Sequence, residues 1–160
     1  MIPRSEMERR RAMRGTDYWV GGKSTMEMKA SHLMERDVLS FEVNVSCHSL
    51  TEAIVKGNFG SVPIVDRENR LIGIVTEYDL LNALLKGKGM METPASEVMT
   101  EAPTSITEEM PAEEIIALIQ ARHLIRVPVV DSEGKLIGIV ARRDILACYV
   151  ESTIGPLPAF

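Results

Sequence analysis

Short apolar runs alternate with amphipathic stretches along this chain, and the whole pattern occurs twice. In each copy a stretch with apolar residues at helical spacing precedes two short runs rich in β-branched residues. The helical stretches are "HSLTEAIVKGN" and "AEEIIALIQARH", and the paired runs lie at 62–65 with 71–75 and at 127–130 with 137–140. Extended segments are expected before these helices, at 38–41 and 103–106, and second helices after the hairpins, at 77–86 and 142–150. The predicted order is β-α-β-β-α, twice.

The two copies are related by a shift of 65 residues. The letters "LIGIV" stand at 71–75 and again at 136–140, and "SVPIVDRENRLIGIVTEYDLL" aligns without a gap with "RVPVVDSEGKLIGIVARRDIL". A duplication of this kind predicts two copies of one fold, each hiding a face that it buries poorly alone. We therefore expect an α/β (α+β) protein with an N-terminal extension at 1–28, repeats at 29–88 and 94–152, and a tail at 153–160.

Single residues in the pattern make local predictions. Asn69 and Gly134 occupy the same place in the two hairpin turns, so both are expected to have left-handed backbone. Ser49 and Pro111 are expected near the helix starts. Glycines interrupt the third strand at 73 and 138, which indicates a bulge or the close approach of a ligand or another backbone, or else tight packing of a helix on the sheet.

Composition narrows the class of protein. Hydrophobic residues make up 45% and charged residues 26%, as in soluble globular proteins. No apolar run is long enough to span a membrane, the N-terminus lacks the apolar stretch of a signal peptide, and the two cysteines suggest reduced, buried thiols. We expect a cytoplasmic protein.

Charge is unevenly distributed. The net charge is −5, yet the first 14 residues hold five arginines against two glutamates, which leaves an acidic remainder. An acidic body argues against nucleic-acid binding by the repeats. The basic arm, "SEMERRRAMRG", could form a short helix with a capping box at Ser5 and Glu8, and Trp19 beyond it could pin the arm to a subunit.

Catalytic machinery is not visible in the sequence. His32, His48 and His123 have no metal-ligand spacing, no C-x-x-C pair occurs, and neither a P-loop nor a G-x-G-x-x-G motif is present. We expect a protein that is not an enzyme and that holds no metal.

Two aspartates stand where the third strand of each copy meets a helix. The segments are "TEYD" at 76–79 and "ARRD" at 141–144, so Asp79 and Asp144 are kept while the hydroxyl of Thr76 is replaced by Ala141. An acid in the first helical turn is explained by capping or by the helix dipole, and equally by a ligand hydroxyl. Prolines in "SVPIV" and "RVPVV" place the strand starts at an edge or a cleft mouth.

Two copies of β-α-β-β-α with "VP[IV]VD…LIGIV…D[LI]L" resemble a tandem pair of CBS domains, known as a Bateman module, over residues 29–151. The resemblance implies a free-standing pair with pseudo-twofold packing and two related clefts. It implies a regulatory ligand, most often an adenine nucleotide (AMP, ADP or ATP, with AMP or ATP favoured), with S-adenosylmethionine and NAD-type ligands as alternatives. No obligatory cofactor is expected, and the regulated protein target is unknown.

The resemblance also implies site residues. In the family a Ser/Thr-x-x-Asp motif supplies an aspartate for ribose hydroxyls and a hydroxyl for phosphate, which carries over to Asp79 and Thr76 and, for ribose only, to Asp144. Arg142 and Arg143 could compensate for the hydroxyl missing at Ala141. The base is expected against the first strand and the residues around the proline, namely Val38, Ser40, Val62 and Pro63 in the first copy and Thr104, Ile106, Val127 and Pro128 in the second.

Arg126 makes the two implied sites unequal. A basic residue two before the proline often reaches phosphate held by the opposite copy, and Arg126 fits this role for the Thr76/Asp79 cleft, whereas Ser61 cannot serve the other cleft. The expectation is that the Thr76/Asp79/Arg126 cleft prefers a phosphorylated ligand and that the Asp144 cleft is weaker or empty.

Three further interpretations stay open. CBS pairs usually form homodimers through their helices, so Leu80, Leu81, Leu84 and Ile145 are expected at an interface or in the intramolecular core. A ligand-free dimerising scaffold is one alternative function. Nucleic-acid binding through the arginine arm is another, ranked third because the body is acidic.

Overall fold

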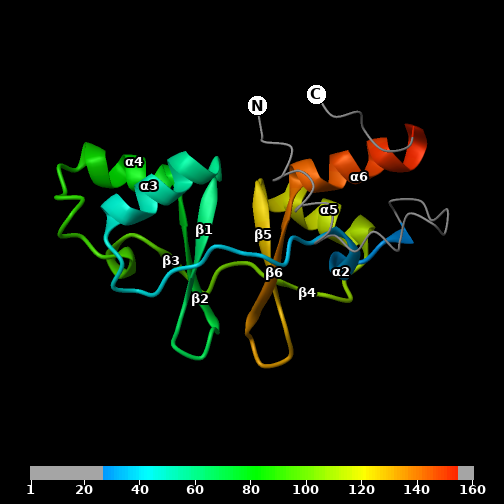
Figure 1. The fold of residues 1–160 in the computed structure, drawn as a ribbon, viewed down its shortest axis with the longest axis horizontal. Coiled ribbons are helices and arrows are strands. Elements are labelled where there is room, and N and C mark those ends of the chain that lie inside the picture. Colours follow the sequence, from blue (N-terminus) through cyan, green and yellow to red (C-terminus); the bar gives the residue numbers. More distant parts are fainter. Residues whose placement is uncertain (1–26, 155–160) are drawn as a thin grey trace. The chain divides into compact units, whose positions relative to one another are not determined.

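The computed structural model describes residues 27–154, which divide into two compact units (Figure 1). Unit 2 comprises Leu39–Thr104 and Ser132–Leu136. Unit 1 comprises the described residues up to Val38, Ser105–Asp131 and the described residues from Ile137 onward. The expectations for the arginine arm, for Trp19 and for the C-terminal tail lie outside the described residues.

Unit 2 is built on a three-stranded antiparallel sheet. Its strands run in the order β1 (Ser61–Val65), β2 (Leu71–Thr76) and β3 (Thr100–Glu101). Its helices are α3 (Cys47–Gly57), α4 (Glu77–Leu85) and the short 3-10 helix η3 (Ala95–Glu97). All five residues of β1 are buried, as is typical of an apolar strand that is covered on both faces.

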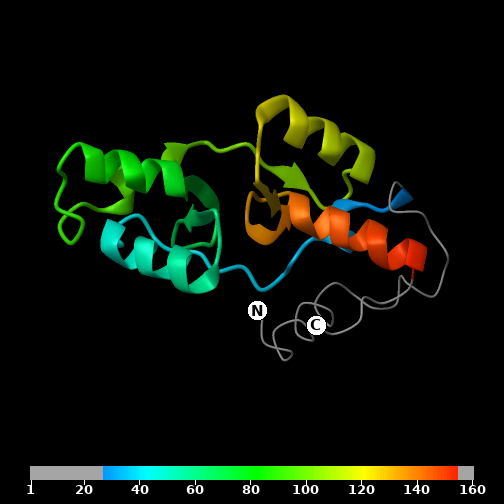
Figure 2. The same ribbon diagram turned by 90° about the horizontal axis from the view of Figure 1, so that it is seen from above.

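Unit 1 has the matching set of elements. Its sheet holds β4 (Ile106–Thr107), β5 (Arg126–Val130) and β6 (Leu136–Ala141), and its helices are α2 (Ala30–Leu33), α5 (Ala112–Arg122) and α6 (Arg142–Ile154). Figure 2 shows α2 (blue) beside α6 (orange to red). The predicted helices and hairpins are confirmed, with α6 extending beyond its expected end at residue 150.

The two extended segments expected at 38–41 and 103–106 contribute little to the sheets. Phe41 forms a single parallel bridge with Ile64, and in unit 1 the pairing of Ile106 with Val129 opens the two-residue strand β4. Within the described residues only the last position of each expected segment therefore pairs. The 65-residue shift is kept in the pairing itself, because Phe41 corresponds to Ile106.

The segment at the start of each sequence repeat pairs with a strand that the sequence pattern did not predict as its partner. Glu35 exchanges backbone hydrogen bonds with Ile139 of β6, at 2.9 and 3.0 Å. Thr100 pairs with Ile74 of β2 at the equivalent place. Each leading segment thus pairs with the third strand of the other sequence repeat, which is why residues 27–38 belong to the unit that contains the second hairpin.

The helix starts and turns follow local chemistry. Ser46, not Ser49, is the N-cap of α3, because its hydroxyl oxygen accepts the backbone N–H of Ser49 at 3.1 Å. Ser49 lies in the first turn of α3 and Pro111 is the N-cap of α5, so both stand near helix starts as expected. The left-handed backbone predicted for the turns is confirmed, with φ of 65° at Asn69 and 79° at Gly134.

The strand glycines are explained by close approach of another chain segment. A Cβ added at Gly73 would lie 2.5 Å from the Met99 sulfur and 3.2 Å from the Thr100 carbonyl oxygen. At Gly138 the equivalent distances are 2.5 Å to the Met34 sulfur and 3.1 Å to the carbonyl oxygen of the next residue. The approach of another backbone accounts for both positions, and at Gly73 the register of β1 and β2 also shifts, between Ile64 and Val65, as the bulge interpretation predicts.

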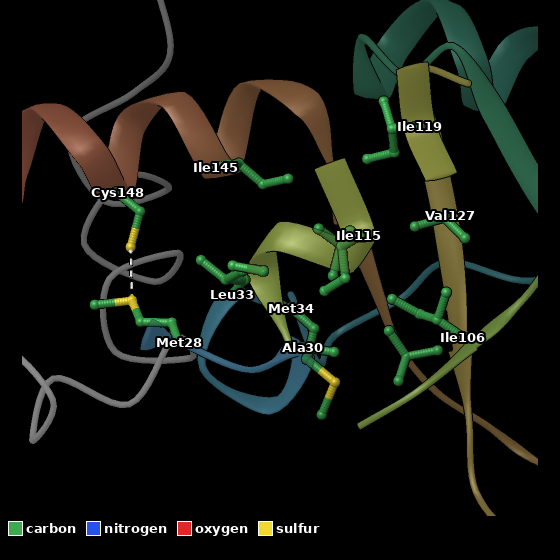
Figure 3. Close-up of a cluster of buried hydrophobic side chains, with 13 residues drawn as sticks. Met28, Ala30, Leu33, Met34, Ile106, Ile115, Ile119, Val127, Ile145 and Cys148 are labelled. Atoms are coloured by element: carbon green, nitrogen blue, oxygen red, sulfur yellow. Dashed lines mark hydrogen bonds between the residues drawn. The ribbon is translucent and has the colours of Figure 1, made fainter. Parts of the chain in front are cut away.

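Each unit has its own apolar core. Buried side chains in unit 1 come from α2, the β-strands, α5 and α6, as Figure 3 shows. The core of unit 2 comprises Cys47, Leu50, Ile54, Val62, Ile64, Val75, Leu80 and Ala95. Both cysteines are buried thiols outside any disulfide, as predicted, and the Cys148 thiol lies 3.6 Å from the Met28 sulfur.

Ala102, in the segment after β3, has a φ of +46°, a conformation that costs an L-residue about 1–2 kcal/mol. We expect Ala102→Gly to raise the free energy of unfolding by about 0.5–1 kcal/mol, since glycine relieves the strain but gains entropy when unfolded. Urea unfolding followed by circular dichroism measures this. Ala53→Gly in α3 is the control and should destabilise by about 1 kcal/mol. A loss of stability in Ala102→Gly would contradict the expectation.

Candidate functional site

The candidate site in unit 2 lies where β1 begins and β2 ends. Ser61 and Thr76 face each other in the antiparallel register, so the first residue of β1 stands beside the last residue of β2. The backbone N–H of Glu77 donates to the Gly60 carbonyl at 3.1 Å. These two contacts hold the start of β1 against the start of α4.

Thr76 and Asp79 form a complete capping box at the N-terminus of α4. The Thr76 hydroxyl oxygen accepts the Asp79 backbone N–H at 3.2 Å, and Asp79 Oδ2 accepts both the Thr76 backbone N–H at 2.8 Å and its hydroxyl at 2.9 Å. The capping interpretation of "TEYD" is thus realised. It engages one carboxylate oxygen only, because no hydrogen bond within residues 27–154 reaches Asp79 Oδ1.

The free oxygen of Asp79 is suited to a ligand hydroxyl. An ionised carboxylate only accepts hydrogen bonds, so its partner must be a donor such as a hydroxyl or an amino group. Asp79 is half-buried, and the capping bonds fix its rotamer before any ligand arrives. A fixed acceptor at a helix start can therefore hold a sugar hydroxyl without further ordering of the side chain.

Three more predicted residues of the first copy lie in unit 2. Val62 and Pro63 are buried in β1, and Ser40 is half-buried next to Phe41. The Phe41 backbone N–H donates to the Pro63 carbonyl at 3.1 Å, which places the segment holding Ser40 along β1. The structure therefore assembles Ser40, Val62, Pro63, Thr76 and Asp79 in one unit, while Val38 belongs to unit 1.

Unit 1 repeats the arrangement with different side chains. The Arg142 backbone N–H donates to the Ile125 carbonyl at 3.0 Å, so the start of α6 lies against the residue before β5. Arg126 opens β5 and is half-buried, and Arg143 is exposed at the start of α6. Asp144 is half-buried, and its carboxylate has no hydrogen bond or ion pair among the described residues; Ala141 has no hydroxyl that could donate to it. Val127 and Pro128 are buried in β5.

The base-contacting residues named for the two copies are out of register by one position. The 65-residue shift that relates Phe41 to Ile106 makes Ser105, not Thr104 or Ile106, the counterpart of Ser40. Ile106 is only 2% exposed in the core of unit 1, and Thr104 belongs to unit 2. The gapless alignment of the repeats pairs Ser40 with Ser105, which makes Ser105 a candidate in their place.

Other charged groups are engaged away from the site. In unit 2, Lys56 pairs with Glu52 at 2.8 Å, Arg70 with Asp66 at 2.9 Å, and Lys88 with Glu97 at 3.4 Å. Hydrogen bonds from the Arg70 backbone and guanidinium hold the pKa of Asp66 below its usual value, and burial raises the pKa of the Cys47 thiol. Among the described residues, no group of three or more His, Cys, Asp or Glu side chains could hold a metal ion, and no helix is long and apolar enough to cross a membrane.

Sequence comparison finds relatives over most of the repeat region. Protein MK0525 of Methanopyrus kandleri is 32% identical over 130 residues, covering 79% of this chain and 66% of that protein. The L-aspartate semialdehyde sulfurtransferase of Methanocaldococcus jannaschii is 29% identical over 131 residues, again 79% of this chain but 25% of the relative. The chain thus spans less than two thirds of these relatives.

Solved structures agree in fold. The CBS domain pair of protein MJ0100, in complex with 5′-methylthioadenosine and S-adenosyl-L-methionine, matches with a TM-score of 0.67 at 27% identity, covering 74% of this chain and 97% of that one. AcuB from Vibrio cholerae matches at 0.72 and 27% identity, covering 78% and 91%. CBSX2 in complex with AMP matches at 0.69 but at 21% identity, covering 78% and 97%, and shows the fold alone.

The family model for the CBS domain matches twice, at residues 30–86 and 95–151. These two matches cover both sequence repeats, and the similar structures are CBS pairs with the same mixed α/β architecture. The resemblance drawn from the sequence is thereby confirmed. The chain belongs to the CBS domain family and carries two CBS domains in tandem.

Proposed function

We propose that this chain is a non-catalytic regulatory module that binds an adenine nucleoside or nucleotide at the site around Asp79. The observation that carries the proposal is the geometry of the capping box. Asp79 Oδ2 is engaged by Thr76, while Oδ1 accepts no hydrogen bond from the described residues. The carboxylate is therefore held in place with one oxygen left for ligand donors.

A ribose offers the donors that this carboxylate lacks. Its 2′ and 3′ hydroxyls can both donate toward one carboxylate, and such charge-assisted hydrogen bonds are each worth about 1.5–3 kcal/mol. The planar base would lie along the apolar start of β1, near Val62 and the segment that holds Ser40. The complex of the MJ0100 CBS pair with two adenosyl compounds, at 27% identity, supports this class of ligand.

Removal of the ribose hydroxyls tests this function directly. We expect adenosine to bind at least about 100-fold more tightly than 2′,3′-dideoxyadenosine, because about 3 kcal/mol of hydrogen bonding to Asp79 is lost with the hydroxyls. Isothermal titration calorimetry on the full chain measures both affinities. Equal affinities would exclude Asp79 as the ribose ligand, and no binding of either compound would favour the ligand-free scaffold.

We further propose that a second copy of the chain covers the outer face of α4. Leu81 and Leu84 on this helix are 62% and 55% exposed, and Tyr78 and Leu85 extend the same apolar stripe. The equivalent positions on α6, Leu146 and Tyr149, are exposed as well. Leu80 and Ile145 lie in the unit cores instead, so of the four expected interface residues only Leu81 and Leu84 are available to a partner.

Charge on the α4 stripe is expected to convert a dimer to a monomer. The double variant Leu81→Asp/Leu84→Asp should halve the mass measured by light scattering after size exclusion, because buried unpaired carboxylates are strongly disfavoured. Val55→Asp on α3, where the valine is 73% exposed, is the control and should leave the mass unchanged. A wild-type chain that runs as a monomer would contradict the proposal.

A further inference from the structure

We infer that the two equivalent sites of this chain select adenosyl ligands of opposite charge. The unit 2 site, with Asp79, takes an uncharged or cationic compound such as a thioether nucleoside or a sulfonium. The unit 1 site, with Asp144, takes a phosphorylated nucleotide. This inference rests on the proposed function and specifies which member of the ligand class each site accepts.

At three equivalent positions around the two sites, the side-chain charge differs between the units, and it differs with the same sign each time. The 65-residue shift relates Ser61 to Arg126, Glu77 to Arg142, and Tyr78 to Arg143. At each position the unit 1 residue is the more positive. The aspartate itself is common to both sites, so it does not discriminate between them.

The backbone places these differing side chains at the same points in both units. Glu77 N–H donates to the Gly60 carbonyl at 3.1 Å, and Arg142 N–H donates to the Ile125 carbonyl at 3.0 Å. Each hydrogen bond joins the first helical residue to the residue before the strand. Arg126 directly follows Ile125, so its backbone lies next to the start of α6, where Arg142 and Arg143 are exposed.

Within the described residues, the start of α4 has no comparable group of basic side chains that could bind a phosphate. Its first turn carries Glu77 and Asp79, and the capping box already uses the Thr76 hydroxyl. Lys56, Arg70 and Lys88 form ion pairs with acidic residues outside α4. Lys86 stands at the C-terminal end of α4, away from its start. These four basic side chains are therefore not arranged around this site.

The helix dipole has the same effect at both sites, so only the charged side chains can make their ligand preferences differ. Both sites lie at the N-terminus of a helix, which favours anions equally in the two units. Arg142 and Arg143 outweigh Asp144 and leave the start of α6 positive, whereas Glu77 and Asp79 leave the start of α4 negative. Charge-assisted hydrogen bonds from arginine to phosphate then favour the nucleotide in unit 1, and repulsion disfavours it in unit 2.

This assignment reverses the order expected from the family resemblance. That expectation gave Arg126 to the Asp79 site and left the Asp144 site weak or empty. In the structure Arg126 directly follows Ile125, whose carbonyl accepts the Arg142 backbone N–H, and all three residues belong to unit 1.

Single-site variants of the full chain separate the two preferences. In Asp144→Asn, which retains the Asp79 site, adenosine and S-adenosylmethionine should bind at least about 10-fold more tightly than AMP. In Asp79→Asn, which retains the Asp144 site, AMP should bind at least about 10-fold more tightly than adenosine. Adding Glu77→Arg/Tyr78→Arg to the Asp144→Asn chain should raise its AMP affinity about 10-fold, and higher salt should reduce this gain. Calorimetry at two salt concentrations measures all of these.

Glu68→Arg in the turn between β1 and β2, added to Asp144→Asn, is the control for a change of charge away from the site and should leave the AMP affinity unchanged. Equal affinities for AMP and adenosine in both single-site variants, with adenosine binding still lost when both aspartates are replaced, would overturn the charge selection alone. If no adenosyl compound binds the wild-type chain, the proposed function fails and the inference fails with it.

Discussion

Replacement of Asp79 by alanine is expected to weaken the binding of adenosine about 100-fold. The side chain would supply the acceptor for two ribose hydroxyls, and charge-assisted hydrogen bonds of this kind total about 3 kcal/mol or more. Isothermal titration calorimetry with adenosine measures the change. Undiminished affinity in Asp79→Ala would refute the assignment of this residue to the ligand.

The fold must be checked in the same variant, because Asp79 also caps α4. Loss of its hydrogen bonds to Thr76 should lower the free energy of unfolding by about 0.5–2 kcal/mol. Asp79→Asn keeps an oxygen that can accept the Thr76 N–H but loses the charge, so it should bind adenosine poorly while staying closer to wild-type stability. Weak binding in both variants, despite their different stabilities, would trace the loss to the ligand contact.

Asp144→Ala is the matched comparison in unit 1. The Asp144 carboxylate has no hydrogen bond or ion pair among the described residues, so its removal should cost less stability than removal of Asp79. Adenosine binding at the Asp79 site should be unaffected. A loss of that binding in Asp144→Ala equal to the loss in Asp79→Ala would show that the two carboxylates do not serve separate sites.

Replacement of Gly138 by alanine is expected to destabilise unit 1 by about 3 kcal/mol, at the upper end of the cost of overpacking. The added Cβ would stand 2.5 Å from the Met34 sulfur and 2.9 Å from its Cγ. Met34 is fully buried and cannot swing aside without disturbing the core. Displacement of its backbone would also strain the pairing of Glu35 with Ile139. Urea unfolding followed by circular dichroism measures the change.

Gly73→Ala in unit 2 is the paired control. Its added Cβ would meet the Met99 sulfur at the same 2.5 Å, but Met99 is half-buried and has room to move. We expect a cost of about 1 kcal/mol there, so the ratio of the two effects reports how firmly each methionine is held. Equal costs in the two variants would show that backbone contact alone, and not the burial of the methionine, sets the penalty.

The exchange of leading segments has a consequence for where the chain can be divided. Sequence repetition suggests that residues 94–152 form one folding unit. In the structure the third strand of that repeat pairs with Glu35, and its core includes Met28, Ala30, Leu33 and Met34. A fragment cut between the repeats would lack these residues, and it would expose the apolar surface that they cover.

Much of the fold could be predicted from the sequence because the relevant physics is local. The alternation of apolar residues decides which stretches become helices and which become hairpin strands, and the left-handed turns follow from the residue types at Asn69 and Gly134. The capping role of Thr76 and Asp79 is equally local, since two residues three positions apart provide donors and acceptors for each other. The duplicated letters supplied the tandem architecture in the same way.

The tertiary structure alone decided which segments pair across the repeats and which oxygen of Asp79 stays available. The sequence repeat did not show that residues 27–38 pack with the second repeat. A pairing between distant segments depends on which apolar surfaces pack together, and it produces no periodic pattern in either segment. The gapless alignment already pairs Ser105 with Ser40, and the structure adds that the Ile106 side chain lies in the core of unit 1. The sequence determines which residue types are present, but the tertiary packing of the neighbouring residues determines which way each side chain points.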